Sequence, residues 1–377
     1  AAAQRVVSNG KIFQELGFEI EYLGVSKTKN YRDGFSEDYS DEFKSLSRGY
    51  PKSGSDWINA ISSSSDIIKY LNEDINSVSL VILYNYPALI TLKVQKFLKS
   101  HNIQVCCDIT EWYDPRGNGL IRSIIKYLDT EFRVRYLARQ NIGVITTSNY
   151  MTEYYCKFSR FVLELPTLFD ISKLNKPERL PLKSNDKEKI QLVYCGSPFD
   201  LNKAKRDSRL VKERLDILIK SLDGLNDEFD FLLTIIGVTK ADYLLVYPEH
   251  KELISKLSLY IKFKGKIDHK SALSIISMSD YSVFFRDNNK VNLAGFPVKF
   301  AESYSLGIPI ISNNIPSLMK YSFLDGVYLL ERGEESTGIR EILKLNTFKK
   351  IDNKNYFDYK EYISDTKKFF FNLGILQ

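Results

Sequence analysis

The fold is decided by residues 295–309, GFPVKFAESYSLGIP, because this stretch encodes one helix with both ends marked. Gly295 lets the backbone approach a ligand closely, and Pro297 suits a first helical turn. Gly307 suits the C-terminal cap, and the apolar residues 308–311 predict a buried strand. A helix that begins in this way points N–H groups and its positive dipole end at whatever lies before it, which is a common way to hold phosphate.

Lys299 and Glu302 lie three residues apart and share one face of this helix. Together with the residues around them, they resemble the donor-site signature of retaining glycosyltransferases of the GT-B fold, the nucleotide-sugar-dependent family of the group 1 or family 4 type. The resemblance implies that Gly295, Phe296, Pro297 and Lys299 contact the sugar and diphosphate of the donor. It also implies that Glu302 binds the nucleotide ribose.

The family's usual pattern has a further glutamate at the position of Ala294. A sub-pattern of polysaccharide enzymes has an upstream arginine and then Ala-Gly-Phe-Pro-x-Lys-Phe-x-Glu. It resembles residues 286–302, which favours the capsular and O-antigen subgroup and adds Arg286 to the donor-binding residues. The alternative is a buried helix after an ordinary Gly-Pro turn. Lys299 and Glu302 would then form a surface pair worth about 0.2–0.5 kcal/mol.

Composition indicates an ordinary soluble enzyme. At 377 residues, 44% of them hydrophobic, the chain is too long for one core and should form two domains. No apolar run approaches the roughly 18 residues of a spanning helix, and no secretory leader opens the chain, so we expect a cytoplasmic protein. The 3 histidines are scattered, which argues against a metal site. A net charge of +6 argues against nucleic-acid binding but not against an anionic membrane surface.

Strand-like apolar runs alternate with amphipathic segments, the pattern of a parallel sheet covered on both faces. The predicted strands are residues 18–25, 80–84, 103–108, 142–147 and 161–165, then 190–195, 231–237, 260–264, 281–285, 308–312 and 327–330. We therefore expect the α/β GT-B fold, two doubly wound Rossmann-like domains that face each other across a cleft. The expected boundaries are an N-terminal acceptor-side domain over 1–170, a linker over 171–189 and a donor-binding domain over 190–350. A C-terminal helix in 351–377 should pack back on the N-terminal domain.

The N-terminus lacks two elements that the family resemblance implies. Residues 2–16 predict a helix capped by Gly17 and followed by a strand. In the family, the first helix follows a buried strand and a glycine-rich turn that contacts the donor diphosphate. The first strand of the N-terminal domain is therefore expected to be missing.

A second constellation, CCDITEWYD over residues 106–114, ends a predicted buried strand, where ligands bind in open α/β sheets. Similar capsule enzymes show Asp-x-x-Glu-Trp here, which makes Asp108 and Glu111 the candidate catalytic carboxylates. Either could take a proton from the acceptor hydroxyl or hydrogen-bond the sugar, while Trp112 and Tyr113 offer a stacking surface. The alternative is a helix N-cap at Asp108 or Thr110 with Trp112 in the core.

A third constellation is YCGSP over residues 194–198, followed by NKAKRD over 202–207. Family enzymes place a glycine turn here, then an arginine and a lysine that neutralise the leaving diphosphate. Gly196 matches the turn and Lys203 or Lys205 the lysine, while Arg286 is the candidate for the second charge. A solvated basic loop is the alternative.

The resemblance implies transfer of a hexosyl group with retention, from a nucleoside-diphosphate sugar to a saccharide acceptor that is lipid-linked. Neither a metal nor another cofactor is expected. A noncatalytic sugar-nucleotide-binding relative and a GT-B nucleotide-sugar epimerase are the alternatives.

A helix predicted from Leu120 carries Ile121, Ile124, Ile125, Leu128 and Phe132 on one side and Arg122, Lys126 and Arg133 on the other. Its basic side predicts peripheral contact with the inner face of the plasma membrane, unless the helix simply packs on its own sheet and leaves that side solvated.

Overall fold

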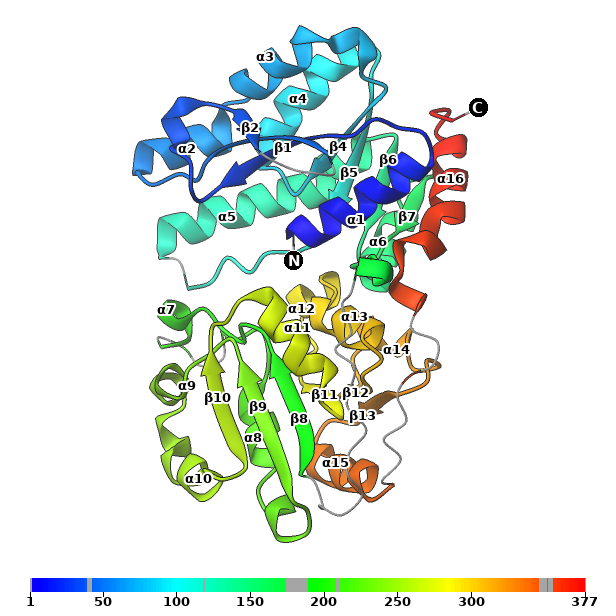
Figure 1. The fold of residues 1–377 in the computed structure, drawn as a ribbon. Coiled ribbons are helices and arrows are strands. Elements are labelled where there is room, and N and C mark those ends of the chain that lie inside the picture. The colour runs from blue at the N-terminus through cyan, green and yellow to red at the C-terminus, as the bar shows by residue number, and fades with distance from the viewer. Residues whose placement is uncertain are drawn as a thin grey trace. The chain divides into compact units, whose positions relative to one another are not determined.

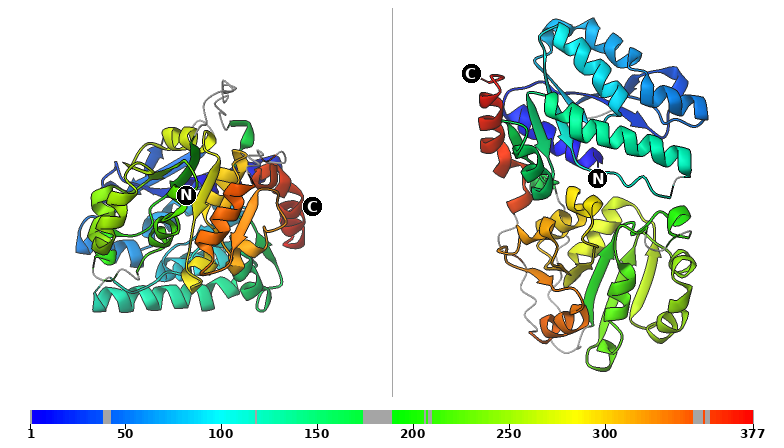
Figure 2. Two further views of the ribbon diagram at one scale, coloured as in Figure 1. Left: turned by 90° about the horizontal axis from the view of Figure 1, so that it is seen from below. Right: turned by 180° about the vertical axis from the view of Figure 1, so that it is seen from behind.

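The computed structural model describes residues 2–38, 43–117, 119–173, 189–205, 207, 210–345, 351 and 355–376. The chain forms two compact α/β units (Figures 1 and 2). The N-terminal unit comprises Ala2–Pro115, Leu120–Pro166 and Tyr362–Gln377, and the C-terminal unit comprises Arg116–Gly119 and Thr167–Glu361. Residues 174–188, most of the predicted linker, lie outside the described residues.

The C-terminal unit is built on one six-stranded parallel sheet of order β10-β9-β8-β11-β12-β13. The chain runs from β8 outward to β9 and β10, then returns to β11 on the opposite side of β8, so the β8–β11 pair is the topological switch point. The strands are β8 Ile190–Cys195, β9 Phe231–Ile236, β10 Ile261–Gly265, β11 Tyr281–Phe284, β12 Ile310–Asn313 and β13 Val327–Leu330. The helices are α7 Leu201–Ala204, α8 Leu215–Ser221, α9 Lys240–Val246, α10 Lys251–Lys256, α11 His269–Ser277, α12 Lys290–Ala294, α13 Val298–Ser305, α14 Pro316–Met319 and α15 Glu335–Lys344.

Helix α13 confirms the helix predicted from the opening stretch. It begins directly after Pro297 and ends before Gly307, which adopts a positive φ of 77°. The Ile308 N–H donates to the Ser303 carbonyl at 2.9 Å, a hydrogen bond that caps the C-terminus of the helix. The chain then enters β12, all of whose residues are buried. The order of helix, glycine and strand therefore follows the sequence signals.

The N-terminal unit has two sheets, of order β1-β3-β2 and β4-β5-β6-β7, in which the β2–β3 pair is antiparallel and the others are parallel. Its strands are β1 Glu21–Ser26, β2 Ser36–Asp38, β3 Lys44–Gly49, β4 Leu80–Tyr84, β5 Gln104–Ile109, β6 Gly143–Thr146 and β7 Val162–Glu164. Its helices are α1 Ala2–Glu15, α2 Gly54–Ser62, α3 Ser65–Glu73, α4 Ala88–Ser100, α5 Leu120–Phe132, α6 Asn149–Cys156 and α16 Ile363–Asn372. Among the described residues no strand joins β1 to β4. Each strand predicted from the sequence overlaps an observed one, while β2 and β3 were not predicted.

Helix α1 confirms the predicted N-terminal helix, and Gly17 follows it with a φ of 90°. Its residue Phe13 contacts Phe370 of α16 with ring centroids 5.2 Å apart, and Phe18 contacts the same ring at 5.4 Å. Phe370 is buried. The last helix therefore contributes to the core of the N-terminal unit.

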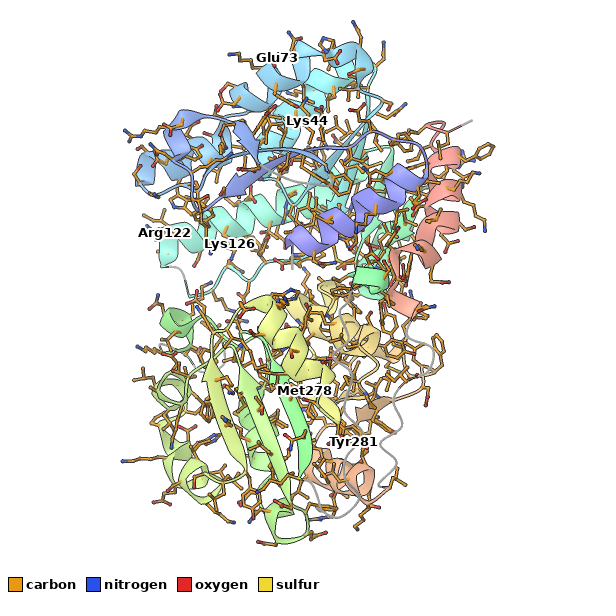
Figure 3. All side chains as sticks on the ribbon, viewed as in Figure 1. Lys44, Glu73, Arg122, Lys126, Met278 and Tyr281 are labelled. Carbon is orange, nitrogen blue, oxygen red and sulfur yellow. The ribbon has the colours of Figure 1, made fainter. Side chains whose placement is uncertain are left out.

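The polar side of α5 makes contacts within its own unit, which corrects the predicted solvation of its basic side. Figure 3 shows Arg122 and Lys126 on this helix. Arg133, in the helical turn that continues α5, is 1% exposed and donates to Asn85 Oδ1 at 2.9 Å. Lys126 lies over the Tyr113 ring at 5.0 Å, and Asp129 accepts the Ala88 N–H at 2.6 Å. Of the predicted basic side, Arg122 alone is exposed. Arg133 therefore cannot contact a membrane, and the helix does not pack on its sheet through its apolar side.

None of the described helices combines the length and the apolar composition that spanning a bilayer requires.

Candidate donor site and the Arg5–Asp108 network

The candidate donor site lies at the switch point of the C-terminal unit. Gly196 follows β8 and Arg286 lies two residues beyond β11, so both stand at the carboxyl ends of neighbouring strands. Open α/β sheets bind ligands at this position. Gly196 has a φ of 153°, and a methyl group on its Cα would lie 2.5 Å from Lys299 Nζ. Any side chain at position 196 would therefore displace the Lys299 ammonium.

Lys299 is buried next to the carboxylate of Glu213, a partner that was not predicted from the sequence. Its ammonium forms an ion pair with Glu213, and the Tyr194 hydroxyl donates to the same carboxylate oxygen. Lys299 Nζ also lies 4.0 Å from the centre of the Tyr194 ring. The side chains of Lys299 and Glu213 are 8% and 6% exposed. Loss of one member of such a buried pair costs about 3–5 kcal/mol, because the other charge stays buried.

The charges of this cluster act on each other's protonation. Burial works to raise the pKa of Glu213, but the nearby Lys299 and Arg286 charges and the two donated hydrogen bonds outweigh it, so the net shift is downward. Burial lowers the pKa of Lys299, and Glu213 opposes this only in part. The lowered pKa of Glu213 favours its ionised form, and a second nearby anion would raise the pKa of Lys299 and favour its ammonium form.

Arg286 supplies a second buried cation and is 2% exposed. Its backbone is fixed by Asn313 at the end of β12, because the Arg286 N–H donates to Asn313 Oδ1 at 2.8 Å and Asn313 Nδ2 donates to the Arg286 carbonyl at 2.7 Å. Its charge contributes to the lowered pKa of Glu213. Lys299 and Arg286 thus both place positive charge near the Glu213 carboxylate at the switch point.

Glu302 lies one helical turn beyond Lys299 but has a different partner. Its Oε1 atom lies 2.9 Å from His269 Nε2, at the start of α11. The hydrogen bond with Glu302 raises the pKa of His269. Burial raises the pKa of Cys195, the last residue of β8, to about 11, and the charges of Lys299 and Glu302 both act on it. The suggested surface pair between Lys299 and Glu302 is therefore wrong, since each residue has its own partner.

The other donor-binding candidates lie around this cluster. Gly295 ends α12 in an extended conformation and Pro297 is the N-cap of α13. The Phe296 ring packs in the core, 5.5 Å from the Tyr321 ring and 5.7 Å from the Phe357 ring, so only its backbone is available to a ligand.

Two further candidates lie in the short helix α7. Lys203 is half-buried next to Gly117, and Lys205 is exposed. In the described part of the chain, no hydrogen bond or ion pair joins either lysine to Lys299 or Glu213. Arg206 lies outside the described residues.

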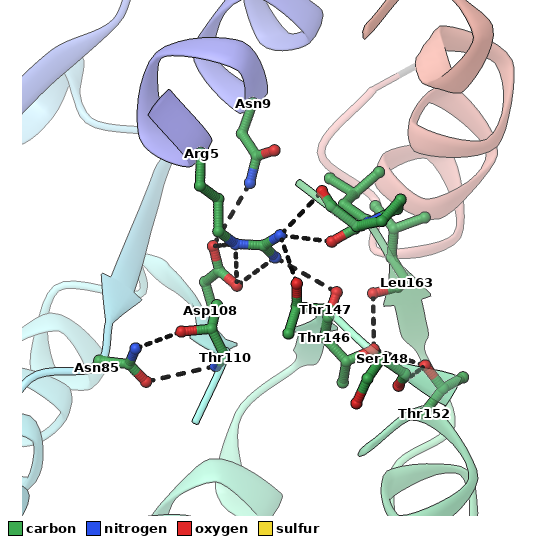
Figure 4. A network of polar contacts seen from close by, with 12 residues as sticks. Arg5, Asn9, Asn85, Asp108, Thr110, Thr146, Thr147, Ser148, Thr152 and Leu163 are labelled. Carbon is green, nitrogen blue, oxygen red and sulfur yellow. Dashed lines mark hydrogen bonds and ion pairs between the residues drawn. The ribbon is translucent and has the colours of Figure 1, made fainter. Parts of the chain in front are cut away.

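Asp108 is the centre of a buried polar network in the N-terminal unit (Figure 4). It lies within β5, not at a helix N-cap, and its carboxylate accepts bonds from Arg5 Nε at 3.0 Å and Arg5 Nη2 at 2.7 Å. Arg5 also donates to Thr147 Oγ1 at 3.3 Å and to the Pro166 carbonyl at 3.2 Å. The Arg5 and Asp108 side chains are 3% and 4% exposed. This ion pair ties α1 to the ends of β5 and β6, so the Asp108 carboxylate has a structural partner.

Glu111 follows β5 in an irregular, half-buried segment. Burial and then the Glu111 charge raise the pKa of the Tyr113 hydroxyl. Trp112 is 4% exposed, and its Nε1 donates to Glu131 at 2.7 Å. Its ring is therefore part of the core, and the suggested stacking surface is reduced to Tyr113.

Sequence reasoning missed Glu213, Tyr194, His269 and Arg5. Glu213 stands in the charged run VKERLD, which has the composition of a solvated helix start, and it lies 86 positions from Lys299 in the sequence. His269 carried a weak signal, because it follows the N-cap Asp268 at the start of a helix. Among the described residues no group of His, Cys, Asp and Glu is arranged to hold a metal ion.

The cluster has the groups that attract a phosphate-like anion. Lys299 and Arg286 supply positive charge, and the N-terminus of α13 adds the equivalent of about half a charge. The first-turn N–H groups of a helix have no intrahelical acceptor and can donate to phosphate oxygens. The Glu302 carboxylate, one turn away, can accept bonds from hydroxyl groups.

No protein-family model matches this sequence, and no curated protein sequence matches it. Solved structures do resemble it. Sucrose-phosphate synthase (tll1590) from Thermosynechococcus elongatus has a TM-score of 0.65 and 14% identity, covering 98% of this chain and 92% of that chain. Anabaena Alr3699/HepE in complex with UDP-glucose has a TM-score of 0.56 and 12% identity, covering 92% and 99%. An E. coli trehalose-6-phosphate structure bound with UDP-2-fluoro glucose has a TM-score of 0.62 and 9% identity, covering 97% and 92%. At these identities the likeness shows the fold alone: the chain has the GT-B fold, built from two Rossmann-like domains.

Proposed function

We propose that this protein is a retaining glycosyltransferase that moves a hexosyl group from a nucleoside-diphosphate sugar to a saccharide acceptor. The observation on which the proposal depends is the buried Lys299 in the first turn of α13. Its ammonium is paired with Glu213 and lies next to Gly196, and the charge of Arg286 acts on its pKa. This is a preformed cationic site at the switch point of a GT-B fold. Solved structures with the same fold include complexes with UDP and UDP-glucose.

The chemistry needs stabilisation of the leaving diphosphate, because its charge increases as the bond to the anomeric carbon breaks. Fixed cations and helix N–H groups stabilise such charge without reorganisation. In this proposal Lys299 and Arg286 bind the diphosphate, Glu302 binds the ribose, and a leaving phosphate oxygen assists deprotonation of the acceptor on the same face. Glu111 is the remaining candidate for an acceptor-side carboxylate, since Asp108 is engaged by Arg5. No metal ion is required by these roles.

We further propose that the acceptor is a lipid-linked saccharide and that the product belongs to a surface polysaccharide of the capsular or O-antigen kind. The proposal then places the protein at the cytoplasmic face of the membrane. Support comes from the resemblance of residues 286–302 to polysaccharide enzymes and from the exposed apolar side of α5.

A panel of nucleotides and nucleotide sugars tests the donor proposal by thermal shift, because a ligand that binds the folded state raises the melting temperature. We expect one nucleoside diphosphate and its hexose conjugate to raise it, and Lys299→Met to abolish the rise. Transfer from that donor to lipid extracts should then be detected by mass spectrometry. Binding without turnover on any acceptor would favour the noncatalytic alternative, and interconversion of the free donor would favour an epimerase.

A further inference from the structure

The outer side of α5 carries an apolar surface that the fold leaves uncovered. Leu120 is 78% exposed, Ile121 74% and Leu128 60%. The α5 apolar face, as we name it, consists of Leu120, Ile121, Ile124, Ile125, Leu128 and Phe132. In both views of Figure 2, α5 lies at the outside of its unit. Monomeric proteins rarely expose so continuous an apolar patch without a partner for it.

This orientation is fixed by polar contacts on the inner side of the helix. The Ser123 hydroxyl donates to the Pro115 carbonyl at 2.7 Å, Asp129 accepts the Ala88 N–H, and Arg133 donates to Asn85. Rotation of the helix would break these contacts and leave the buried Arg133 without its Asn85 acceptor, which is unfavourable. The apolar face therefore cannot turn inward.

The charges around this face are of one sign. Both carboxylates of α5 are engaged, Asp129 by the Ala88 backbone and Glu131 by Trp112 and Arg135. The exposed Arg122 lies in the first turn between Ile121 and Ser123. The surface offered outward is thus apolar with a cationic edge, which is complementary to an anionic lipid surface.

We propose that the α5 apolar face inserts into the headgroup region of an anionic membrane, with α5 lying in the membrane plane. The helix of 13 residues is about 20 Å long, too short for a hydrocarbon core of about 30 Å. Such helices insert about 5–10 Å with their apolar side. The sequence predicted membrane contact through the basic side of this helix. In this proposal the apolar side contacts the lipid instead, and the lysine at 126 stays on the protein side.

A second copy of the chain is the less favoured occupant. In a two-fold dimer the same patch meets itself, so two copies of the same cationic edge would come together. The half-exposed tyrosines at 127 and 136 also suit a membrane interface, where the ring is apolar and the hydroxyl is hydrated.

The inference rests on the proposed function only for the lipid-linked acceptor, and vesicle binding tests it without any acceptor. We expect the full-length protein to sediment with vesicles of phosphatidylglycerol and phosphatidylcholine in equal parts. The double variant Ile121→Asp/Leu128→Asp should lower the partition coefficient by about tenfold or more, since each of these side chains loses its favourable transfer from water. The matched control is Leu259→Asp in the C-terminal unit, where the leucine is 77% exposed; its partitioning should equal that of the wild type.

Arg122→Gln should weaken binding at low salt and have little effect at high salt, where charge is screened. Unchanged partitioning of the double variant would overturn the inference. So would a wild-type dimer in sedimentation velocity that the double variant converts to monomer. Nucleotide binding by the same double variant, measured in free solution, should equal the wild type. If the wild type sediments with vesicles but binds no nucleotide, the membrane inference stands and the donor proposal fails.

Discussion

Replacing Glu213 by Gln removes one charge from the centre of the candidate donor site and keeps the shape of the side chain. Lys299 would then remain buried without its carboxylate partner. Breaking a buried ion pair from one side costs about 3–5 kcal/mol, so the free energy of unfolding in urea should fall by that amount. The Lys299→Met variant should lose stability for the complementary reason, because Glu213 then lacks its ammonium partner.

The double variant Glu213→Gln/Lys299→Met completes a double-mutant cycle, which measures the interaction energy between these two side chains. It removes one charge of each sign, so it should lose much less stability than the sum of the two single variants. The exposed pair Lys256–Asp223, at 2.6 Å, is the control, and its own cycle should show little coupling because water solvates both charges. Additivity of the Glu213 and Lys299 effects within about 0.5 kcal/mol would refute the reasoning.

The effect of Glu213 also has a defined dependence on pH. Its folded-state pKa is lowered, so its stabilising contribution is present above the unfolded value of about 4.3 and is lost as the pH falls through the folded value. The difference in stability between the wild type and Glu213→Gln should therefore be largest near neutral pH and shrink in acid.

The remaining predictions concern the other candidate residues. Glu302→Gln should weaken donor binding by about 1.5–3 kcal/mol in calorimetry, the scale of a hydrogen bond to a charged group, and unchanged affinity would remove it from the ribose site. The same variant should lower the pKa of His269 in an NMR titration, since Glu302 is the main cause of its upward shift. The stability from that pair is present below about pH 6.5 and is lost as the pH rises through the folded pKa. Asp108→Asn should cost about 3–5 kcal/mol of stability by leaving Arg5 buried without its counter-ion, and a fully stable but inactive variant would instead restore Asp108 as a catalyst. Transfer activity should survive saturating EDTA, and a loss reversed by Mn²⁺ or Mg²⁺ would contradict the cationic account of the diphosphate.

Much of the fold was predictable because buried parallel strands are apolar runs with clear ends. Strands β4, β8 and β13 match their predicted bounds: 80–84 and 327–330 are continuous apolar or aromatic segments, and 190–195 is interrupted only by Gln191. Strands β2 and β3 were missed because SED and KSLSRG contain too few apolar residues to be recognised. Their pairing depends on tertiary contacts, which local sequence does not report.

The site was predictable in its position but not in its partners. Gly196, Lys299 and Glu302 stand next to predicted strands and helices, so topology alone brings them to the switch point. Glu213 was not predictable, because a carboxylate in a charged run has the same local signature whether it is solvated or buried. Helix α5 shows the same limit: periodicity identifies the residues that share a face, but not which face the rest of the chain covers.

The central claim is that Lys299, held by Glu213, binds the donor diphosphate. Titration calorimetry of the nucleoside diphosphate that ranks first in the thermal-shift panel tests this most directly, on the wild type and on Glu213→Gln/Lys299→Met. The account predicts that the double variant is folded and binds about tenfold to a hundredfold more weakly, the equivalent of one lost charge-assisted contact. A folded double variant with wild-type affinity would contradict it.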